Sequence, residues 1–219
     1  DNARLPRLRS ALKRLGYIVN VEVKDTSRYG VPQRRRRLIL LAGQGAEIPF
    51  AAPARRTYTV RETFAKLRKR RAKLDALHNL PELRSEKVKK LIRLIPKDGG
   101  SRMDLGMNSQ LKCHQNCNGF KDVYGRMKWD DVAPTITGGC CNPSKGRFLH
   151  PRANRTITLR EAALLQSFPP NYYFSLERGK FSAAQMIGNA LPPEFIRRHA
   201  RQVVAFVKRR RESRIPTPK

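Results

Sequence analysis

Long apolar runs, cysteine and negative charge are all scarce in this sequence. No stretch approaches the roughly 20 apolar residues that a membrane-spanning helix requires, so we expect no membrane partner. Four cysteines are too few for the disulfide framework of a secreted protein of this length. We therefore expect reduced thiols in a cytoplasm. The apolar share of 39% is enough for a real hydrophobic core.

The shortage of acidic residues gives the chain a large positive charge. It has 47 Lys and Arg residues against 17 Asp and Glu residues, and a formal charge of +30. A polyanion is the expected partner, and nucleic acid is the first candidate. The alternative is the arginine excess of a ribosome-associated or thermophilic protein. The charge thus predicts a class of partner but no reaction.

Residues 1–46 carry the pattern of one helix and two strands. Leucines recur at intervals of three or four over residues 5–15, and Gly16 then ends the stretch as a helix C-cap does. Residues 17–23 alternate apolar and polar, which predicts a strand. Residues 38–42 are continuously apolar, which is typical of a strand buried on both faces. We expect these to be neighbouring strands of an α/β sheet.

The middle of the chain is basic and rich in loops. Residues 61–97 predict two helices: an apolar stripe marks the first, and the second has Ser85 at its cap and Pro96 at its end. A glycine-rich loop follows, and then a compact β-type stretch at residues 122–139. The stripe consists of Phe64, Leu67, Leu74 and Leu77. This segment should form a second domain or a large insertion.

The regular pattern returns near the C-terminus. Thr158 and Glu161 have the spacing of a capping box and begin a helix that Pro169 stops. Another helix should begin at Pro193 and continue to residue 207. Residues 208–219 form a basic tail that we expect to be disordered. The apolar stripe of the last helix is Phe195, Ile196, Val203 and Val207.

Four consecutive arginines stand where the second strand begins, in "YGVPQRRRRLILLA". Side chains alternate across a strand, so Arg35 and Arg37 share one face while Arg34 and Arg36 share the other. Guanidinium groups stay charged and donate hydrogen bonds in a rigid plane, so one pair can hold a planar ligand edge or a phosphate. The alternative is a basic segment that only contacts solvent.

Three sequence blocks occur in a fixed order: the arginine block, "RTITLREAALLQSFPPNYYF" and "AAQMIGNALPPEFI". Together they resemble the last three conserved blocks of the DNA cytosine carbon-5 methyltransferases. The resemblance implies an α/β, Rossmann-like catalytic domain at residues 1–46 and 156–207, which binds S-adenosylmethionine. A loop-rich, mixed target-recognition domain at residues 47–155 would interrupt it. The stretch from residue 122 onward is similar to bacterial members, which implies a restriction-modification enzyme in a bacterial or archaeal cytoplasm.

The resemblance also implies a reaction: a flipped cytosine is attacked by a cysteine thiolate and methylated from S-adenosylmethionine. Gln33, Arg35 and Arg37 match the family's Gln-x-Arg-x-Arg pattern, whose arginines help to hold the flipped cytosine. Asn189, with Ala190 and Leu191 beside it, matches the cofactor-side block. A tight turn capped by the Asn189 side chain is a structural alternative. Arg160 and Glu161 are expected to be architectural.

Double-stranded DNA is the expected partner of the middle segment. The basic run should contact phosphates without reading bases, whereas residues in the β-type stretch should read the sequence. The basic run comprises Lys66, Arg68, Lys69, Arg70 and Arg71, and the candidate reading residues are Arg126, Thr135, Ile136 and Thr137.

The departures from the family pattern predict a partial enzyme. None of the four cysteines follows a proline, as the family's nucleophile does, and neither the Glu-Asn-Val block nor the Gly-rich cofactor turn occurs. We therefore expect the C-terminal half of a methyltransferase, inactive without an N-terminal half in cis or as a separate subunit. A stand-alone DNA-binding module is the alternative, although it would need neither the arginine pair nor the cofactor-side block. The Cys-Phe-Thr signature of the tRNA-methylating branch is also absent.

The cysteines also raise the question of zinc. "CHQNC" places Cys113 and Cys117 near His114, and Cys140 and Cys141 are adjacent. Adjacent thiols are too close for an ordinary pair of zinc ligands. We therefore predict ordinary thiols and no metal site.

Overall fold

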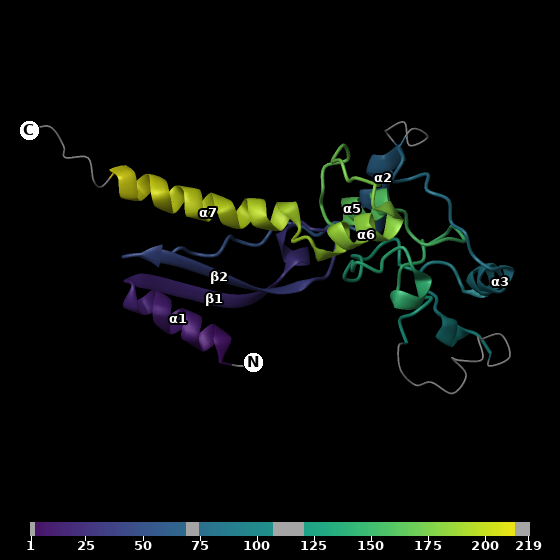
Figure 1. The fold of residues 1–219 in the computed structure, drawn as a ribbon, viewed down its shortest axis with the longest axis horizontal. Helices are drawn as coiled ribbons and strands as arrows, with labels where there is room; N and C mark the ends of the chain where they lie inside the picture. The colour runs from purple at the N-terminus through teal and green to yellow at the C-terminus, as the bar shows by residue number, and fades with distance from the viewer. Residues whose placement is uncertain (1–2, 69–74, 107–120, 213–219) are drawn as a thin grey trace, which may run out of the picture.

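The computed structural model describes residues 3–68, 75–106 and 121–212, which form two lobes joined at the middle of an elongated molecule (Figure 1). The first lobe contains α1 (Arg4–Arg14), β1 (Tyr17–Asp25), β2 (Arg36–Gln44) and α7 (Pro193–Glu212). The second contains α2 (Val60–Arg68), α3 (Glu86–Leu94), α5 (Leu159–Leu165) and α6 (Gly179–Asn189). Short 3-10 helices are η1 (Thr26–Tyr29), η3 (Arg102–Asp104) and η5 (Pro143–Lys145).

The first lobe is built on the antiparallel pair β1–β2, whose register joins Tyr17 to Gln44 and Asp25 to Arg36. Helices α1 and α7 lie on opposite sides of this pair (Figure 1). Gly16 ends α1 with a φ of +79°, a left-handed conformation that favours glycine. The predicted helix, its C-cap and both strands of the α/β pattern are therefore confirmed.

The expectation that residues 38–42 are buried on both faces is wrong. Leu38 is 49% exposed, and Val23 opposite it is 51% exposed. Within the described residues the sheet has only two strands, so its faces are covered in part and its outer edges are unpaired. An apolar strand of this kind needs further strands or helices to bury it.

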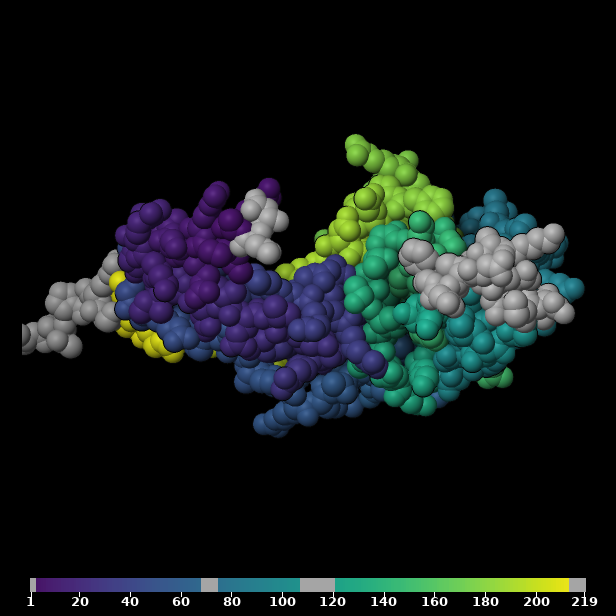
Figure 2. Space-filling view, turned by 90° about the horizontal axis from the view of Figure 1, so that it is seen from below, coloured from purple at the N-terminus to yellow at the C-terminus, as the bar shows by residue number. Residues whose placement is uncertain are grey.

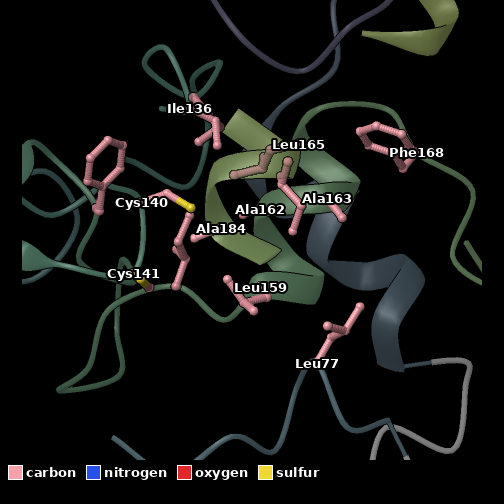
Figure 3. Packing of buried hydrophobic residues seen from close by; sticks show 14 of the residues in the cluster. Leu77, Ile136, Cys140, Cys141, Leu159, Ala162, Ala163, Leu165, Phe168 and Ala184 are labelled. Atoms are coloured by element: carbon pink, nitrogen blue, oxygen red, sulfur yellow. The ribbon is translucent and has the colours of Figure 1, made fainter. Parts of the chain in front are cut away.

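The second lobe contains one large core (Figure 3) and a smaller apolar cluster beneath α3. The large core combines residues between 60 and 148 with residues between 157 and 187, and every residue of α5 is buried. Because α5 and α6 pack into the core of the middle segment, the core does not divide at residue 155, where the sequence places a domain boundary. The chain returns to the first lobe only near Leu191, which packs beside Phe195 and Tyr29.

Several predicted helix boundaries need adjustment. Helix α2 ends at Arg68, so Leu77 of the expected stripe lies beyond it, and Leu74 lies outside the described residues. Helix α7 continues to Glu212, so residues 208–212 are helical and not a disordered tail. Residues 213–219 lie outside the described part. None of the described helices combines the length and apolar content that crossing a bilayer needs.

The capping box at the start of α5 is confirmed. The Thr158 hydroxyl accepts a hydrogen bond from the Glu161 backbone at 3.1 Å, and the Glu161 carboxylate accepts one from the Thr158 backbone at 2.7 Å. Ser85 stands at the N-cap of α3, as expected, but its side chain makes no capping hydrogen bond. Helix α6 was not predicted, because its apolar residues form no clear stripe: the large side chains of Phe181 and Met186 are exposed, whereas the buried face is made mostly of small residues.

Candidate functional site

Gln33 joins three distant segments through one buried side-chain amide. Its oxygen accepts a hydrogen bond from the Ile136 backbone at 2.7 Å. Its nitrogen donates to the Gln166 side chain at 2.9 Å. The Gln166 nitrogen donates in turn to the Ile187 carbonyl at 2.7 Å. The arginine block, the β-type stretch and the last two blocks therefore meet at this point.

Arg35 reinforces the same junction. It is 4% exposed, and its guanidinium donates to the Ile136 carbonyl at 2.6 Å and to the Gly188 carbonyl at 2.8 Å. Burial, with a smaller contribution from the charge of Arg37, lowers the pKa of Arg35 to about 10. The side chain is still a cation at neutral pH. Because its two terminal nitrogens are engaged by backbone oxygens, Arg35 is a positioning residue here, not a free ligand for a base.

The other three arginines are more accessible. Arg37 is half-buried, and among the described residues its guanidinium donates one hydrogen bond, to the carbonyl of its neighbour Arg36 at 2.7 Å. Arg34 and Arg36 are exposed, and Arg34 forms an ion pair with Asp131. The alternation of burial along the four arginines follows the predicted alternation of faces. Only Arg37 of the inward pair has a side chain left to reach a ligand.

The cofactor-side residues lie at the end of α6. Asn189 is the last residue of this helix and is exposed, while Gly188 before it is buried. A Cβ atom on Gly188 would lie 2.1 Å from the Gly138 nitrogen, so only glycine fits at this close approach. The Gly-Asn pair therefore ends a helix, whereas the sequence suggested a turn before one.

The chemistry of these residues is compatible with S-adenosylmethionine, but three residues can form only part of a binding site. Asn189 offers an exposed amide, Ala190 is extended at the helix C-cap, and Leu191 offers a half-buried apolar side chain. An amide beside an apolar contact suits one wall of a pocket for such a ligand. These three residues make only that wall.

Two of the predicted base-reading residues are buried, which corrects that expectation. Arg126 is fully buried and donates five hydrogen bonds, to oxygens of Ile92, Ile95, His150, Ala153 and Asn154. Carbonyls at the end of α3 have no partner within the helix, and Arg126 supplies donors to them. Ile136 is also fully buried, in the large core. Neither side chain can contact DNA in this conformation.

The two threonines lie beside an open groove of about 770 Å³. Thr137 is exposed, and Thr135 is half-buried with its hydroxyl donating to the Arg34 carbonyl at 2.7 Å. The walls carry four basic side chains, and we call this surface the basic groove. It is lined by Arg34, Lys128, Thr135, Thr137, Lys145 and Arg147, together with Asp122 and Asp131.

The two groove lysines were not predicted, although Lys128 lies within the β-type stretch and Lys145 follows it closely. The aliphatic part of each lysine side chain packs against a glycine. A Cβ atom added to Gly99 would lie 2.6 Å from the Lys128 side chain, and one added to Gly139 would lie 2.8 Å from the Lys145 side chain. The sequence signal that could have indicated them is a pair of lysines on either side of Gly138 and Gly139.

The predicted phosphate-contact run is only partly described. Lys66 is exposed on α2, with its ammonium 5.5 Å from the ring of Tyr58. Arg68 is the last residue of α2, whereas Lys69, Arg70 and Arg71 lie outside the described residues. The structure does not bring Lys66 into the lining of the basic groove.

The described cysteines are inert thiols in the core. Cys140 and Cys141 are free and buried, and burial raises the pKa of Cys140 to about 12. Cys113, His114 and Cys117 lie outside the described residues. Within the described ranges no three potential metal ligands cluster.

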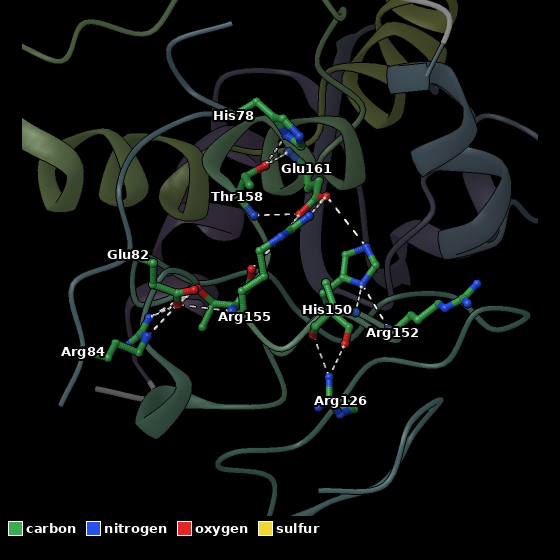
Figure 4. Close-up of polar contacts among 11 residues, drawn as sticks. His78, Glu82, Arg84, Arg126, His150, Arg152, Arg155, Thr158 and Glu161 are labelled. Atoms are coloured by element: carbon green, nitrogen blue, oxygen red, sulfur yellow. Dashed lines mark hydrogen bonds and ion pairs between the residues drawn. The ribbon is translucent and has the colours of Figure 1, made fainter. Parts of the chain in front are cut away.

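A buried polar network supports the α5 end of the second lobe (Figure 4). The Glu161 carboxylate accepts two hydrogen bonds from Arg155, at 2.7 and 2.8 Å, and these lower its pKa although burial opposes the shift. His150 accepts hydrogen bonds from the backbones of Arg152 and Ala153, and burial lowers its pKa to about 4. Arg160 pairs with Asp75 at 2.5 Å. Arg160 and Glu161 are thus engaged in structural contacts.

Comparison with known proteins identifies the relatives of this arrangement. Residues 2–205 match the family described as C-5 cytosine-specific DNA methylase. The type II methylase M.HgiDII of Herpetosiphon aurantiacus is 36% identical over 208 residues, which are 90% of this chain and 58% of that protein. The type II methyltransferase M1.HphI of Haemophilus parahaemolyticus is 30% identical over 83% of this chain and 46% of its own length. The chain therefore spans about half the length of these curated relatives.

Solved structures share the fold. A putative DNA modification methyltransferase encoded within a prophage of E. coli superposes with a TM-score of 0.57 at 17% identity, covering 95% of this chain and 66% of that one. The Entamoeba histolytica methyltransferase EhMeth superposes with a TM-score of 0.51 at 14% identity, covering 93% of this chain and 57% of that one. At such identities the likeness shows the α/β fold alone.

Proposed function

Since the chain belongs to the C-5 cytosine-specific DNA methylase family, we propose that it is the DNA-reading and lower catalytic portion of a DNA cytosine-5 methyltransferase. The relatives are named as type II methylases, which supports a restriction-modification role. The observation that carries the proposal is the junction of Gln33 and Arg35 with Ile136 and Gly188. It joins the arginine block to both the recognition segment and the cofactor-side helix, as a shared site requires.

The residues of this chain divide the catalytic work as follows. Gln33 and Arg35 fix the position of the arginine block, and Arg37 donates to the flipped cytosine and stabilises negative charge that develops on its ring. Asn189, Ala190 and Leu191 hold S-adenosylmethionine, which supplies the electrophilic methyl group when it is bound. The attacking thiolate comes from the N-terminal half, because Cys140 and Cys141 are buried and protonated.

DNA lies against the basic groove in this proposal. Thr135 and Thr137 read base edges, since hydroxyl groups can both donate and accept. Lys128 and Lys145 contact phosphates and position the duplex without reading its sequence. The basic run that begins at Lys66 adds further phosphate contacts. The substrate is double-stranded DNA, from which the target cytosine is extruded.

The N-terminal half completes the protein in this proposal, in cis or as a separate subunit. The exposed apolar side chains of Ile18, Val23 and Leu38 lie on the β1–β2 pair, where further strands would cover them. Each such side chain contributes roughly 1.5 to 3 kcal/mol on full burial. Val204 and Val207 on α7 are also partly exposed.

Co-expression with an N-terminal half tests the proposal. We expect the lone chain to melt broadly, to bind DNA weakly and to transfer no methyl group from labelled S-adenosylmethionine. Adding the N-terminal half should give a sharp melt and methylated cytosine. Full activity from the lone chain would contradict the need for a partner. Tight, sequence-specific binding without methyl transfer in either preparation would favour the alternative, a stand-alone DNA-binding module.

A further inference from the structure

A second arginine-rich hollow lies apart from the basic groove, where the segment after β2 passes the first half of α7. Its volume is about 640 Å³, and it is lined by residues 51–56 and Tyr58 on one side and by Arg198, Arg201 and Gln202 on the other. No residue is shared with the basic groove. Figure 2 shows the corresponding blue stretch of chain at the lower edge of the molecule, below the first lobe. We call this surface the α7 hollow.

Two of its four arginines are held in place by neighbours. The Arg198 guanidinium donates to Glu194 at 2.9 Å, one helical turn away on α7. The Arg56 guanidinium donates to Glu62 at 3.0 Å and lies 4.5 Å from the centre of the Tyr58 ring. An arginine with its plane fixed by a carboxylate or an aromatic face loses less conformational entropy when it binds an anion.

The other two arginines are uncompensated. Arg55 and Arg201 are exposed, and neither pairs with a carboxylate among the described residues. The four guanidinium groups face two carboxylates, Glu62 and Glu194, which leaves at least two net positive charges around the hollow. Glu194 also accepts two hydrogen bonds from Arg197, which does not line the hollow, so it is shared between two arginines. Charge of one sign that converges on a concave surface attracts a counter-charge more strongly than scattered surface arginines do.

The wall between the arginines is made of small residues. Ala52 and Pro53 are exposed and Ala54 is half-buried, and the Ala54 backbone is anchored by a hydrogen bond to the Arg28 carbonyl at 2.8 Å. Ala51 lines the hollow but is itself buried. Short side chains let a bulky, branched group approach the backbone closely. A tetrahedral phosphate with arginines on two sides suits this shape, because guanidinium forks bind phosphate oxygens in pairs.

We propose that the α7 hollow binds the phosphodiester backbone of duplex DNA, as a contact separate from the basic groove. The inference rests on the proposed function in one respect, that DNA is the substrate. The net charge of the hollow then contributes to affinity for every DNA sequence and to the salt dependence of binding. It contributes nothing to the choice of site, because phosphates carry no sequence information.

The test compares two double variants that remove the same charge. Arg55→Ala with Arg201→Ala removes the two uncompensated arginines, whereas Arg7→Ala with Arg9→Ala removes two exposed arginines of α1 outside both surfaces. Binding of a labelled 30-base-pair duplex is measured from 50 to 200 mM salt, on the chain combined with its N-terminal half. Each lost phosphate contact should reduce the slope of log K against log salt by about 0.9.

We expect the Arg55→Ala, Arg201→Ala double variant (the hollow variant) to lose close to two phosphate contacts. The Arg7→Ala, Arg9→Ala double variant (the α1 variant) should lose fewer than one. Arg55→Lys with Arg201→Lys should keep most of the slope, because it keeps both charges. Equal slopes for the hollow and α1 variants would overturn the inference, and so would a lysine variant that behaves like the alanine variant.

Two further binding measurements distinguish duplex DNA from other anionic ligands of the α7 hollow. Titration with inorganic phosphate should show no saturable binding at millimolar concentration, since a single free anion lacks the neighbouring diesters. Saturable binding with an unchanged DNA slope would assign the hollow to a free anion and overturn the proposal. A slope change seen with single-stranded RNA and not with duplex DNA would also overturn it. Variants of the basic groove report on the proposed function separately, so that the two failures are distinguishable.

Discussion

The Arg35 guanidinium donates to the Gly188 carbonyl at 2.8 Å, across 153 positions of sequence. Since the same side chain also donates to the Ile136 carbonyl, Arg35→Ala leaves two buried carbonyl oxygens without this donor. We expect a loss of roughly 2 to 5 kcal/mol in the free energy of unfolding. Urea denaturation of the reconstituted enzyme measures it, with Arg34→Ala as the exposed control. Arg35→Lys should fall between them, and equal stability of the two alanine variants would contradict the positioning role.

Arg37 should affect turnover more than stability. Its side chain is half-buried and among the described residues donates one hydrogen bond, to a neighbouring backbone carbonyl, so Arg37→Ala disturbs little packing. If Arg37 stabilises charge on the flipped cytosine, its removal should cost on the order of 2 to 4 kcal/mol in kcat/KM. Arg36→Ala, an exposed neighbour on the opposite face, should cost far less. Equal, small losses in a methyl-transfer assay would remove Arg37 from the catalytic site.

The basic groove should separate affinity from specificity. Lys128→Ala with Lys145→Ala should weaken binding to all DNA sequences and lower the salt slope by about two phosphate contacts. Thr137→Val should instead change which site is preferred. Lys87→Ala with Lys90→Ala on α3 removes the same charge from an exposed surface outside the groove. A change of site preference in the lysine variant, with none in Thr137→Val, would place the recognition surface elsewhere.

Acid should destabilise the second lobe through His150. The folded-state pKa of about 4 lies below the ordinary value of 6.5, so the native lobe favours the neutral ring. This contribution is fully present above about pH 6.5 and is lost as the pH falls toward 4, by an amount on the order of 3 kcal/mol. The pKa of Glu161 is lowered too, so protonation of this carboxylate at still lower pH also decreases the stability of the folded lobe.

Trp129 provides the measurement, because it is the single tryptophan of the chain and its ring centre lies 5.2 Å from that of His150. Urea denaturation followed by its fluorescence at pH 7 and pH 5 should show lower stability at pH 5. His150→Asn keeps a side-chain acceptor for the two backbone donors but does not titrate, so its pH dependence should be smaller. An unchanged pH dependence would show that other groups control acid stability.

Elements with local causes were predictable from the amino-acid sequence. Leucine spacing and Gly16 fix α1, the Thr158–Glu161 spacing fixes the start of α5, and strand alternation separates Arg35 from Arg34 and Arg36. The order of three blocks also pointed to the family. The helix, cap and strand signals each lie within a few residues, where chain geometry alone decides which side chains meet.

The long-range partners of these residues depend on how the whole chain folds. Arg126 looks like a surface cation in sequence, yet it satisfies carbonyls that α3 and the loop after His150 leave unpaired. Helices α5 and α6 join the core of the middle segment because their buried faces find apolar partners there, across the boundary at residue 155 that the family resemblance implied. Burial and hydrogen-bond satisfaction depend on the whole chain, and no local pattern encodes them.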